Sequence, residues 1–344
     1  MKAIVKRQAG PGLEMADVPV PVVGPGEALV RVDACSICGT DLHIYIWDAW
    51  SEARIKPPRV IGHEFAGHVV EVGPNTSRVA TGDYVSSDSH LVCGRCALCK
   101  TGQAHVCTSY KILGVDVDGC FAEYVKVPET SLWLNPASMP PKVASLQDPF
   151  GNAVMSTLNG PVACQSVLVV GCGVIGLMAV AIARACGASM VIGVDINPYR
   201  LELAKRLGAH HVVDGRIPWV EEVSNLTGGS GADVVLEMSG NPGAITNCLK
   251  AARNAGRVSL LGIPAKPVEI DLAQDVVFKA LRIDGITGRR IWDTWYQTSA
   301  LLGGILDITS LITHEMDMRD FETGFELMKK GECGKVIMYA GGLP

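Results

Sequence analysis

The feature that constrains this chain most is a glycine-rich turn, Gly171-Cys-Gly173-Val-Ile-Gly176, which follows the apolar run Val167–Val170 and opens an apolar helical segment. A strand, G-x-G-x-x-G and a helix in this order are typical of the first βα turn of a nucleotide-binding parallel sheet. Asp195 ends the next apolar run, where an acid would bind the adenosine ribose. The pattern therefore favours a dinucleotide site over a glycine turn in an unrelated α/β protein.

Each glycine of this motif has a separate role. Gly171 permits the tight turn, Gly173 lets the backbone approach a pyrophosphate, and Gly176 lets helix and strand pack closely. Asp195 would repel a 2'-phosphate, which favours NAD over NADP. Arg200 weakens this preference slightly, because an arginine can bind a 2'-phosphate; packing beside the adenosine and simple exposure on a helix are the other interpretations.

The two halves of the chain differ in their apolar patterns. The first 130 residues or so contain short alternating segments between Pro and Gly turns, which predicts a mainly β domain: Ala3–Lys6, Ala28–Val32, His68–Val72, Asp83–Ser86 and Phe121–Val127. From Ser166 strands and helices alternate, which predicts a doubly wound parallel sheet: Val167–Val170, Ile175–Cys186, Val191–Asp195, Pro198–Leu207, Val234–Met238, Ala244–Ala252, Val258–Gly262 and Asp271–Ala280. The remainder predicts helical structure from Ile286 to Trp295, a helix over Phe321–Lys330 and a strand over Lys335–Tyr339. The fold class is thus α/β with two domains.

Composition narrows the possible functions. The chain has 344 residues, enough for about two domains, with 30 basic and 35 acidic residues and no long basic run, so nucleic acid is not an expected partner. The apolar stretch Val167–Ala183 has the minimum length of a membrane span, but its glycines favour a buried strand and helix instead. The N-terminus lacks the apolar core of a signal peptide, so we expect a cytoplasmic protein with no membrane partner. In that compartment the 12 cysteines predict reduced thiols or metal ligands.

Four of these cysteines lie within fifteen residues: Cys93, Cys96, Cys99 and Cys107. Four closely spaced thiols suit a closed tetrahedral zinc, which is a structural site. Disulfides are disfavoured by the expected compartment. An iron–sulfur cluster is disfavoured by the spacing, because seven residues instead of three separate the third and fourth cysteines and no proline follows the fourth.

A second group combines Cys38-Gly-Thr40-Asp-x-His43 with Gly62-His63-Glu64. One thiolate, one imidazole and one carboxylate from Cys38, His63 and Glu64 make three ligands and leave a position for water or substrate, as in a catalytic zinc. Spacing alone does not show whether these three residues are zinc ligands or have an ordinary structural role. Zinc lowers the pKa of bound water from about 15.7 to about 7. If it lowers the pKa of a bound alcohol in the same way, the resulting alkoxide is a better hydride donor than the alcohol. An open Lewis acid beside a hydride acceptor therefore indicates alcohol oxidation.

These motifs, in this order, resemble the zinc-dependent medium-chain dehydrogenases over the whole chain. Longer strings resemble the members of that family that oxidise the 3-hydroxyl of L-threonine to L-2-amino-3-oxobutanoate: His43-Ile-Tyr-Ile-Trp-Asp48, Asp148-Pro-Phe-Gly-Asn-Ala153, Glu237-Met-Ser-Gly240, Gly288-Arg289 and Thr294-Trp-Tyr296. The resemblance implies a GroES-like catalytic domain over 1–149 with a zinc lobe near 90–110, and a Rossmann NAD-binding domain over 150–288. It further implies that 289–344 returns to the catalytic domain and that the protein is a homotetramer acting on a small amino acid.

Site residues follow from the same resemblance. Cys38, His63 and Glu64 match catalytic zinc ligands, and the four clustered cysteines match structural ligands. Thr40 and His43 match a proton relay, while Asp148 matches a carboxylate that acts in proton relay or as an occasional ligand. The positions that match NAD contacts, beyond the three glycines of the turn, are Ile175, Asp195, Arg200, Gly262, Ile263, Pro264, Ile286 and Thr287.

Several roles stay open from the sequence. His90 is a candidate for shaping the substrate pocket or a plain loop histidine, and Trp47 and Trp50 are candidate pocket walls or packing residues. Thr287 stands where the family has a larger aromatic residue, and Cys172 stands in the glycine turn as a candidate oxidation-sensitive thiol. The rival functions are a polyol or 2,3-butanediol dehydrogenase on the same scaffold, and a non-catalytic NAD-binding redox sensor that uses Cys172 and the zinc thiolates as its switch.

Overall fold

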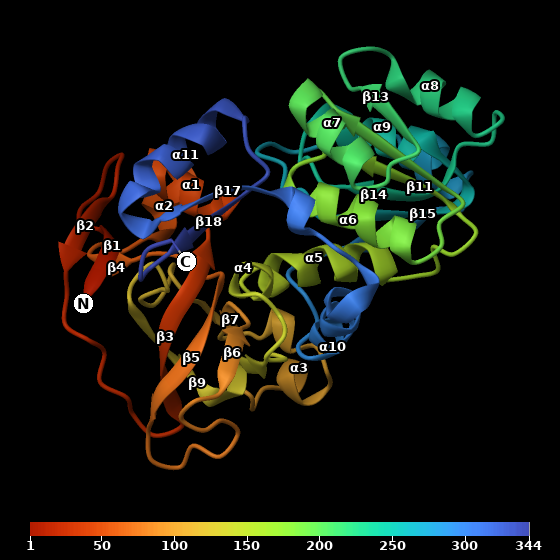
Figure 1. Cartoon of the computed structure of the whole chain (residues 1–344). Coiled ribbons are helices and arrows are strands. Elements are labelled where there is room, and N and C mark those ends of the chain that lie inside the picture. The colour runs from red at the N-terminus through yellow and green to blue at the C-terminus, as the bar shows by residue number, and fades with distance from the viewer. Residues whose placement is uncertain (344) are drawn as a thin grey trace. The chain divides into compact units, whose positions relative to one another are not determined.

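The computed structural model describes residues 1–343 and divides them into two compact units (Figure 1). The first unit contains Met1–Pro149, Arg290–Trp295 and Ile312–Pro344, and the second contains Phe150–Arg289 and Tyr296–Leu311. Pro344 lies outside the described residues. Two helices contain unit boundaries, α5 (Gln147–Leu158) and α10 (Asp293–Ala300).

The first unit is built mainly from antiparallel strands. Its largest sheet has the order β10-β6-β5-β3-β18-β17, with β9 also paired to β3, and smaller sheets have the orders β2-β1-β4 and β7-β8. The strands are β1 (Lys2–Lys6), β2 (Glu14–Asp17), β3 (Glu27–Ser36), β4 (Arg59–Val60), β5 (Phe65–Val72), β6 (Tyr84–Ser87), β7 (His90–Leu91), β8 (Lys111–Ile112), β9 (Tyr124–Pro128), β10 (Leu132–Leu134), β17 (Ile312–Asp317) and β18 (Lys335–Tyr339). The helices are α1 (Gly39–Ile46), α2 (Ala49–Arg54), α3 (Ala97–Lys100), α4 (Pro141–Ala144) and α11 (Phe321–Lys330).

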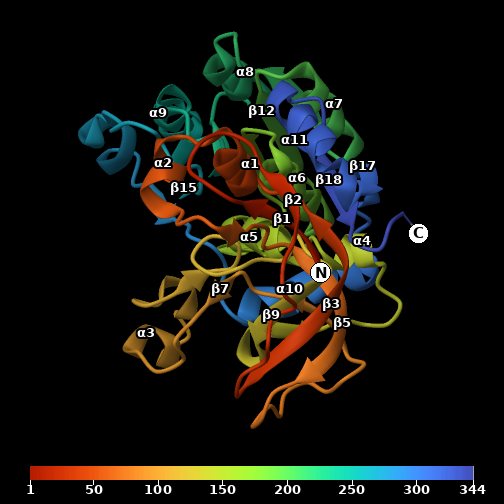
Figure 2. The ribbon, with the colours of Figure 1, turned by 90° about the vertical axis from the view of Figure 1, so that its left-hand side faces the viewer.

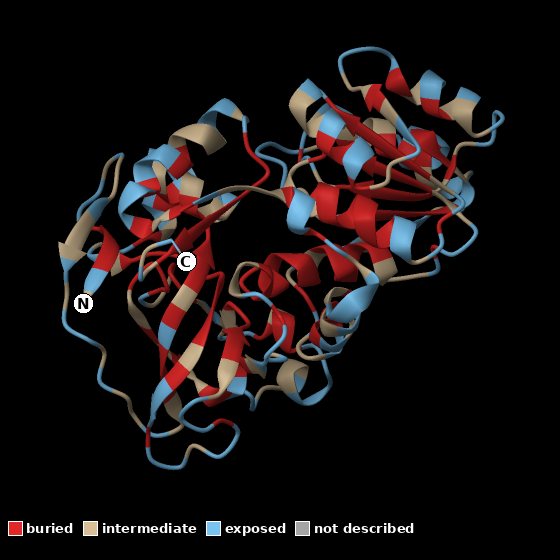
Figure 3. Ribbon diagram, in the orientation of Figure 1, coloured by how far each residue is buried: buried red, intermediate tan, exposed pale blue. Residues whose placement is uncertain are grey.

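The C-terminal part of the chain completes this unit. Strand β18 pairs antiparallel with β3, so a segment from the end of the chain extends a sheet begun near its start. Helix α11 packs beside α1, where Tyr45 stacks on Phe325 with ring centroids 4.6 Å apart (Figures 1 and 2). The buried apolar residues of β3, β5 and β18 form the core under these helices (Figure 3). Within the same unit, the segment around α3 stands apart from β3 and β5 in Figure 2.

The second unit is a six-stranded parallel sheet with the order β13-β12-β11-β14-β15-β16, which is the strand order of the Rossmann fold. Helix α6 packs beside α7 and α8 beside α9, and the central strands β11, β12 and β14 are almost wholly buried (Figure 3). The strands are β11 (Ser166–Val170), β12 (Met190–Asp195), β13 (His211–Asp214), β14 (Ala232–Glu237), β15 (Ala252–Leu260) and β16 (Arg282–Gly285). The helices are α6 (Val174–Ala185), α7 (Pro198–Arg206), α8 (Trp219–Leu226) and α9 (Pro242–Ala251). The predicted α/β class, with a mainly β part and a doubly wound parallel sheet, is confirmed.

Three local expectations differ from the structure. The helical stretch expected from Ile286 to Trp295 begins only at Asp293, because strand β16 and an irregular segment precede it. The segment 271–280 contains only a short π turn, Ala273–Val277. The segment after 289 is divided, since residues 296–311 belong to the second unit.

The apolar stretch Val167–Ala183 divides at the glycine turn into β11 and α6, as its glycines predict. None of the helices formed by residues 1–343 has both the length and the apolar character needed to span a bilayer.

Candidate active site and cofactor site

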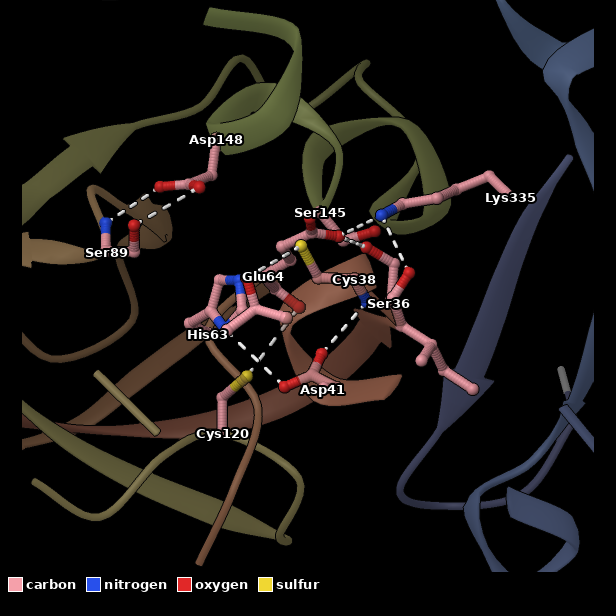
Figure 4. Close-up of polar contacts among 12 residues, drawn as sticks. Ser36, Cys38, Asp41, His63, Glu64, Ser89, Cys120, Ser145, Asp148 and Lys335 are labelled. Carbon is pink, nitrogen blue, oxygen red and sulfur yellow. Dashed lines mark hydrogen bonds and ion pairs between the residues drawn. The ribbon is translucent and has the colours of Figure 1, made fainter. Parts of the chain in front are cut away.

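Three side chains of the first unit converge as a candidate metal group. Cys38 is the N-cap residue of α1, and His63 and Glu64 immediately precede β5. Their ligand atoms, one from each side chain, all lie within 4.8 Å of one another (Figure 4). The sequence places Cys38 and His63 twenty-five positions apart, and the sheet brings them together because β3, which ends just before Cys38, pairs with β5.

The backbone before His63 requires glycine. Gly62 has a φ of +91°, and a Cβ there would lie 2.1 Å from the ring of Phe121. A larger residue would displace the ring or the turn, and either change would move His63 and Glu64. The Gly-His-Glu string is therefore a single geometric unit.

The two carboxylate oxygens of the buried Glu64 have different surroundings. One carboxylate oxygen, Oε2, accepts hydrogen bonds from the buried ammonium of Lys335 and the hydroxyl of Ser36 (Figure 4). Lys335 also donates to the carbonyl of Ile37 at 2.9 Å. The other oxygen, Oε1, has no hydrogen-bond partner among residues 1–343, although it is buried. A buried carboxylate oxygen without a partner is costly, so this atom fits the ligand of a cation.

Asp41 supports the same group from α1. Its Oδ2 accepts the backbone N–H of Cys38 at 2.9 Å, and its Oδ1 lies 3.6 Å from Nδ1 of His63. Burial disfavours the charged form of His63, but the charges of Asp41 and Cys38 outweigh it and raise the pKa of the imidazole to about 10. Such a concentration of anionic groups around one imidazole is compensated by a divalent cation. The residues present therefore fit a zinc ion held by one thiolate, one imidazole and one carboxylate.

The two predicted relay residues both lie on α1. The Cys38 thiol donates to Oγ1 of Thr40 at 3.8 Å, which places Thr40 beside the metal group. His43 is one turn further along the helix, on the same face as Thr40 because they are three residues apart. Its Nδ1 lies 2.5 Å from Oδ2 of Asp48, a partner that the sequence reasoning did not identify although it lies within the string His43–Asp48.

Asp148 and His90 occupy other positions in the first unit. The carboxylate of Asp148 accepts the backbone N–H of Ser89 at 2.7 Å and its hydroxyl at 3.3 Å, and Figure 4 shows it directed toward Ser89. It is not a member of the metal group formed by Cys38, His63 and Glu64. The backbone N–H of His90 donates to Asp88 at 2.8 Å, and its ring packs on Tyr110 with centroids 5.1 Å apart.

The four clustered cysteines form a second group in the segment around α3. Their sulfur–sulfur distances are 3.5 Å for Cys96–Cys99 and Cys93–Cys107, 3.8 Å for Cys96–Cys107 and 3.9 Å for Cys93–Cys99. Four sulfurs about 2.3 Å from one zinc, at tetrahedral angles, lie about 3.8 Å apart, whereas a disulfide bond is about 2.05 Å long. The backbone N–H of Cys99 donates to Cys96 and lowers the pKa of that thiol to about 6, which favours the ligating thiolate. The geometry fits one tetrahedral ion.

The glycine turn of the second unit has the geometry that its sequence predicts. Gly171 has a φ of +92°, and a Cβ on Gly176 would lie 1.9 Å from the carbonyl oxygen of Gly171. Around Gly173, by contrast, a Cβ would meet nothing within 4 Å, so this face of the loop is open to a ligand. Asp195, at the end of β12, accepts the backbone N–H of Cys172 at 2.7 Å, and Nη1 of Arg200 lies 3.9 Å from its carboxylate.

The remaining predicted cofactor positions lie at the carboxyl ends of strands of the same parallel sheet. Ile175 is in the first turn of α6, residues 262–264 follow β15, and Ile286 and Thr287 follow β16. Strands β15 and β16 are neighbours, and the backbone N–H of Ile286 donates to Leu260 at 2.9 Å. This edge of a parallel sheet is where such folds bind nucleotides.

Sequence reasoning missed the role of Glu237 at this edge. Its buried carboxylate accepts the backbone N–H groups of Ser239 at 2.8 Å and Gly240 at 3.0 Å, and a Cβ on Gly262 would lie 2.5 Å from it. Burial raises the pKa of Glu237 despite these hydrogen bonds. Glu237 therefore fixes the loops after β14 and β15 against each other.

Cys172 does not have the environment of an oxidation-sensitive thiol. Its side chain is fully buried, with Sγ 3.7 Å from the carbonyl oxygen of Val194 on β12, and burial raises its pKa far above the usual value. Reactive cysteines are thiolates with access to solvent. The expectation that Cys172 is a redox-sensitive point is therefore not supported, and the sensor hypothesis loses one of the thiols proposed for its switch.

Comparisons with known proteins agree with this geometry. Residues 24–137 match the family model of the alcohol dehydrogenase GroES-like domain, and residues 174–303 match that of the zinc-binding dehydrogenases. The structure superposes on the alcohol dehydrogenase TADH from Thermus sp. ATN1 with a TM-score of 0.92 at 30% identity, covering 98% of this chain and 99% of that one. An Escherichia coli CFT073 protein described as a short chain alcohol dehydrogenase, complexed with NADH, gives a TM-score of 0.90 at 30% identity, covering 98% and 99%. This chain belongs to the zinc-dependent medium-chain dehydrogenase family.

Curated relatives within that family are more specific. An L-threonine 3-dehydrogenase of Bacillus licheniformis is 53% identical over 341 residues, covering 98% of each chain. One of Pyrococcus horikoshii is 50% identical over 343 residues, again covering 98% of each chain.

Proposed function

We propose that this protein is a zinc- and NAD-dependent dehydrogenase that oxidises the 3-hydroxyl of L-threonine to L-2-amino-3-oxobutanoate. The observation that carries the proposal is the group of half-buried Cys38 with buried His63 and Glu64, in which one oxygen of the Glu64 carboxylate is unpartnered within residues 1–343. Relatives named L-threonine 3-dehydrogenase, about half identical over nearly the whole chain, support the choice of substrate. The first unit would act as the catalytic domain and the second as the NAD-binding domain.

Residues of both units would hold the zinc ions and the dinucleotide. Cys38, His63 and Glu64 would hold the catalytic zinc, and the four-cysteine group would hold a structural zinc. The turn Gly171–Gly176 would hold the NAD pyrophosphate at the N-terminus of α6, and Asp195 would hold the adenosine ribose. Arg200, the loop 262–264 and residues 286–287 would border the rest of the dinucleotide. When bound, zinc acts as a Lewis acid toward the substrate oxygen, and NAD accepts a hydride.

The side chains of the chain itself provide proton transfer and positioning. Thr40 would accept the proton that leaves the substrate hydroxyl and hand it toward His43, whose exposed ring would release it to solvent. Lys335 and Ser36 hold one oxygen of Glu64, so the other oxygen keeps a fixed direction. Asp148 would act indirectly, by fixing the backbone at Ser89, and His90 would border the substrate pocket.

The substrate assignment is tested by initial rates of NADH formation with zinc-loaded protein and NAD. L-threonine should be preferred over D-threonine, L-serine, sorbitol and 2,3-butanediol. A preference for sorbitol or butanediol would transfer the enzyme to the polyol or diol branch, with the fold and both metal groups unchanged.

We also propose that the protein is a cytoplasmic homotetramer. The edge strand β16 of the parallel sheet has no partner on its outer side within the described chain, and large apolar side chains nearby are exposed, among them Leu272, Val277, Phe278 and Ile283. Unpaired strand edges and apolar patches are typical of subunit interfaces. The mass of the particle by light scattering tests the proposed tetramer, and the mass of a monomer would contradict it.

A further inference from the structure

We propose that Asp48 is a positioning residue that sets the tautomer of His43, so that Nε2 of the imidazole is the proton-accepting atom. The inference rests on the proposed function, in which His43 is the outer proton acceptor. Its basis is a side-chain contact of 2.5 Å between Nδ1 of His43 and Oδ2 of Asp48. The second oxygen of Asp48 accepts the backbone N–H of Ser51 at 3.0 Å as the N-cap of α2. Both carboxylate oxygens are therefore oriented.

The backbone turn after α1 also brings Asp48 close to His43. Helix α1 is followed by its C-cap residue Trp47, which has a φ of 58° and donates its backbone N–H to the carbonyl of His43 at 2.9 Å. The backbone N–H of Asp48 also points to this carbonyl, at 3.4 Å. This left-handed turn returns the chain over the last turn of α1 and brings the carboxylate of Asp48 to the imidazole.

A buried lysine supports the turn from the other side. The ammonium of Lys6 lies 4.6 Å from the ring centroid of Trp47 and donates to the carbonyls of Gly10 and, at 2.8 Å, Gly12. The backbone N–H of Gly12 in turn donates to Tyr45 at 2.7 Å. The loop 6–12 is thus fastened to the segment that carries Asp48. Trp47 is accordingly a support of the relay segment, and Trp50 lies edge-on to the ring of His43 at 6.1 Å.

The chemistry follows from what each atom can donate. An ionised carboxylate only accepts hydrogen bonds, and a neutral imidazole carries its proton on one nitrogen. With Asp48 at Nδ1, that nitrogen must carry the proton, so the lone pair is on Nε2. A proton that leaves the substrate hydroxyl then forms the Nε2–H bond and gives an imidazolium paired with Asp48. The His43 side chain is 56% exposed, so the Nε2 proton can pass to water and restore the neutral form.

The chain contains a matched control pair. Nδ1 of His68 lies 2.6 Å from Oδ2 of Asp33, and these side chains are 40% and 19% exposed, against 56% and 32% for His43 and Asp48. His68 is on β5 and Asp33 on β3, and neither belongs to the proposed site. Replacing Asp33 therefore alters the same kind of contact without touching the relay.

The test is the variant Asp48→Asn in the full-length, zinc-loaded protein. Asparagine caps α2 as well as aspartate does, but its amide N–H₂ would face Nδ1 of His43 and move the imidazole proton to Nε2. With L-threonine and NAD, we expect kcat to fall roughly ten- to a hundredfold, toward the lower end of general-base contributions, with KM nearly unchanged. Asp33→Asn should retain wild-type kcat. Asp48→Ser, which keeps the cap but removes the carboxylate, should lose activity as Asp48→Asn does.

A second readout does not depend on turnover. Side-chain ¹⁵N NMR of histidine-labelled protein, assigned with His43→Gln, should show His43 protonated on Nδ1 in the wild type and on Nε2 in Asp48→Asn. An Nε2-protonated wild type, or wild-type kcat in Asp48→Asn despite a changed tautomer, would overturn the inference. If the wild type does not oxidise L-threonine, the proposed function fails, while the NMR result still decides whether Asp48 sets the tautomer.

Discussion

The two cysteine-containing metal groups of the first unit differ in ligand set, burial and surroundings. The four-cysteine group has four sulfurs spaced as one tetrahedral ion requires, on short elements of a segment that stands apart from the main sheet. The group of Cys38, His63 and Glu64 offers three different ligand atoms, and a buried lysine holds its carboxylate. The first arrangement would complete the coordination sphere of a zinc ion, and the second would leave one position for substrate. Both groups contain thiols, so the presence of thiols does not distinguish a structural metal site from a reactive one. The other ligands and the side chains that hold them make this distinction.

The largest expected effect is from His63→Ala, which removes a ligand of the open group. Turnover of L-threonine should fall by at least about 10³-fold, because zinc would be lost or displaced, while NAD affinity should change little because the proposed nucleotide contacts belong to the other unit. Steady-state rates and NAD titration by fluorescence measure the two effects. Residual activity within tenfold of the wild type would remove the open group from the mechanism.

Cys96→Ser should act mainly on stability. Loss of one thiolate opens the closed sphere, so metal analysis should show one zinc fewer per chain, and Tm should fall by roughly 10 °C, as a loss of about 3 kcal/mol implies. Any loss of kcat should be far smaller than in His63→Ala. Equal losses of kcat in the two variants would break the distinction between the groups.

The pH dependence of metal-free protein provides a third comparison. The folded-state pKa of His63 is raised to about 10, so its stabilising contribution is fully present below about pH 6.5 and is lost as the pH rises toward 10. The stability difference between wild type and His63→Ala, both treated with chelator, should shrink by more than about 1 kcal/mol between pH 6 and pH 9. Urea unfolding at both pH values measures it, and a difference that grows with pH would contradict the sign.

Cys172→Ala should have the smallest effect. The thiol is buried and binds no metal in either group, so kcat should stay within about twofold of the wild type and stability within about 1 kcal/mol. Alkylation of the native protein by iodoacetamide should spare Cys172. Rapid modification of this residue would restore the sensor hypothesis.

Periodicity in the sequence was most reliable where elements are regular. Helix α11 and strand β18 begin and end where the pattern predicts, and β11, α6 and β12 agree within a residue or two. Helix α5 was missed because it contains Pro149 and Gly151, and α1 because it starts inside a metal-ligand motif. Packing determined these elements against their local signals.

The site was predictable only in part, for a similar reason. Motif strings name ligands and glycines, because these residues are close in sequence and restricted in type. The partners that orient them are often distant in sequence or are of a common residue type that no motif singles out. Lys335 is 271 residues from Glu64, and Glu237 holds the loops that follow two strands. Asp41, three residues from Cys38, and Asp48, five residues from His43, are orienting partners close enough in sequence to be found from it.

The most direct test of the account is a zinc titration of metal-free protein in which Tm and NADH formation from L-threonine are followed together. The closed thiolate group should bind first, so Tm should recover mainly with the first equivalent of zinc and L-threonine turnover only with the second. Full turnover after one equivalent, or no turnover of L-threonine after two, would contradict the division between a structural and a reactive site.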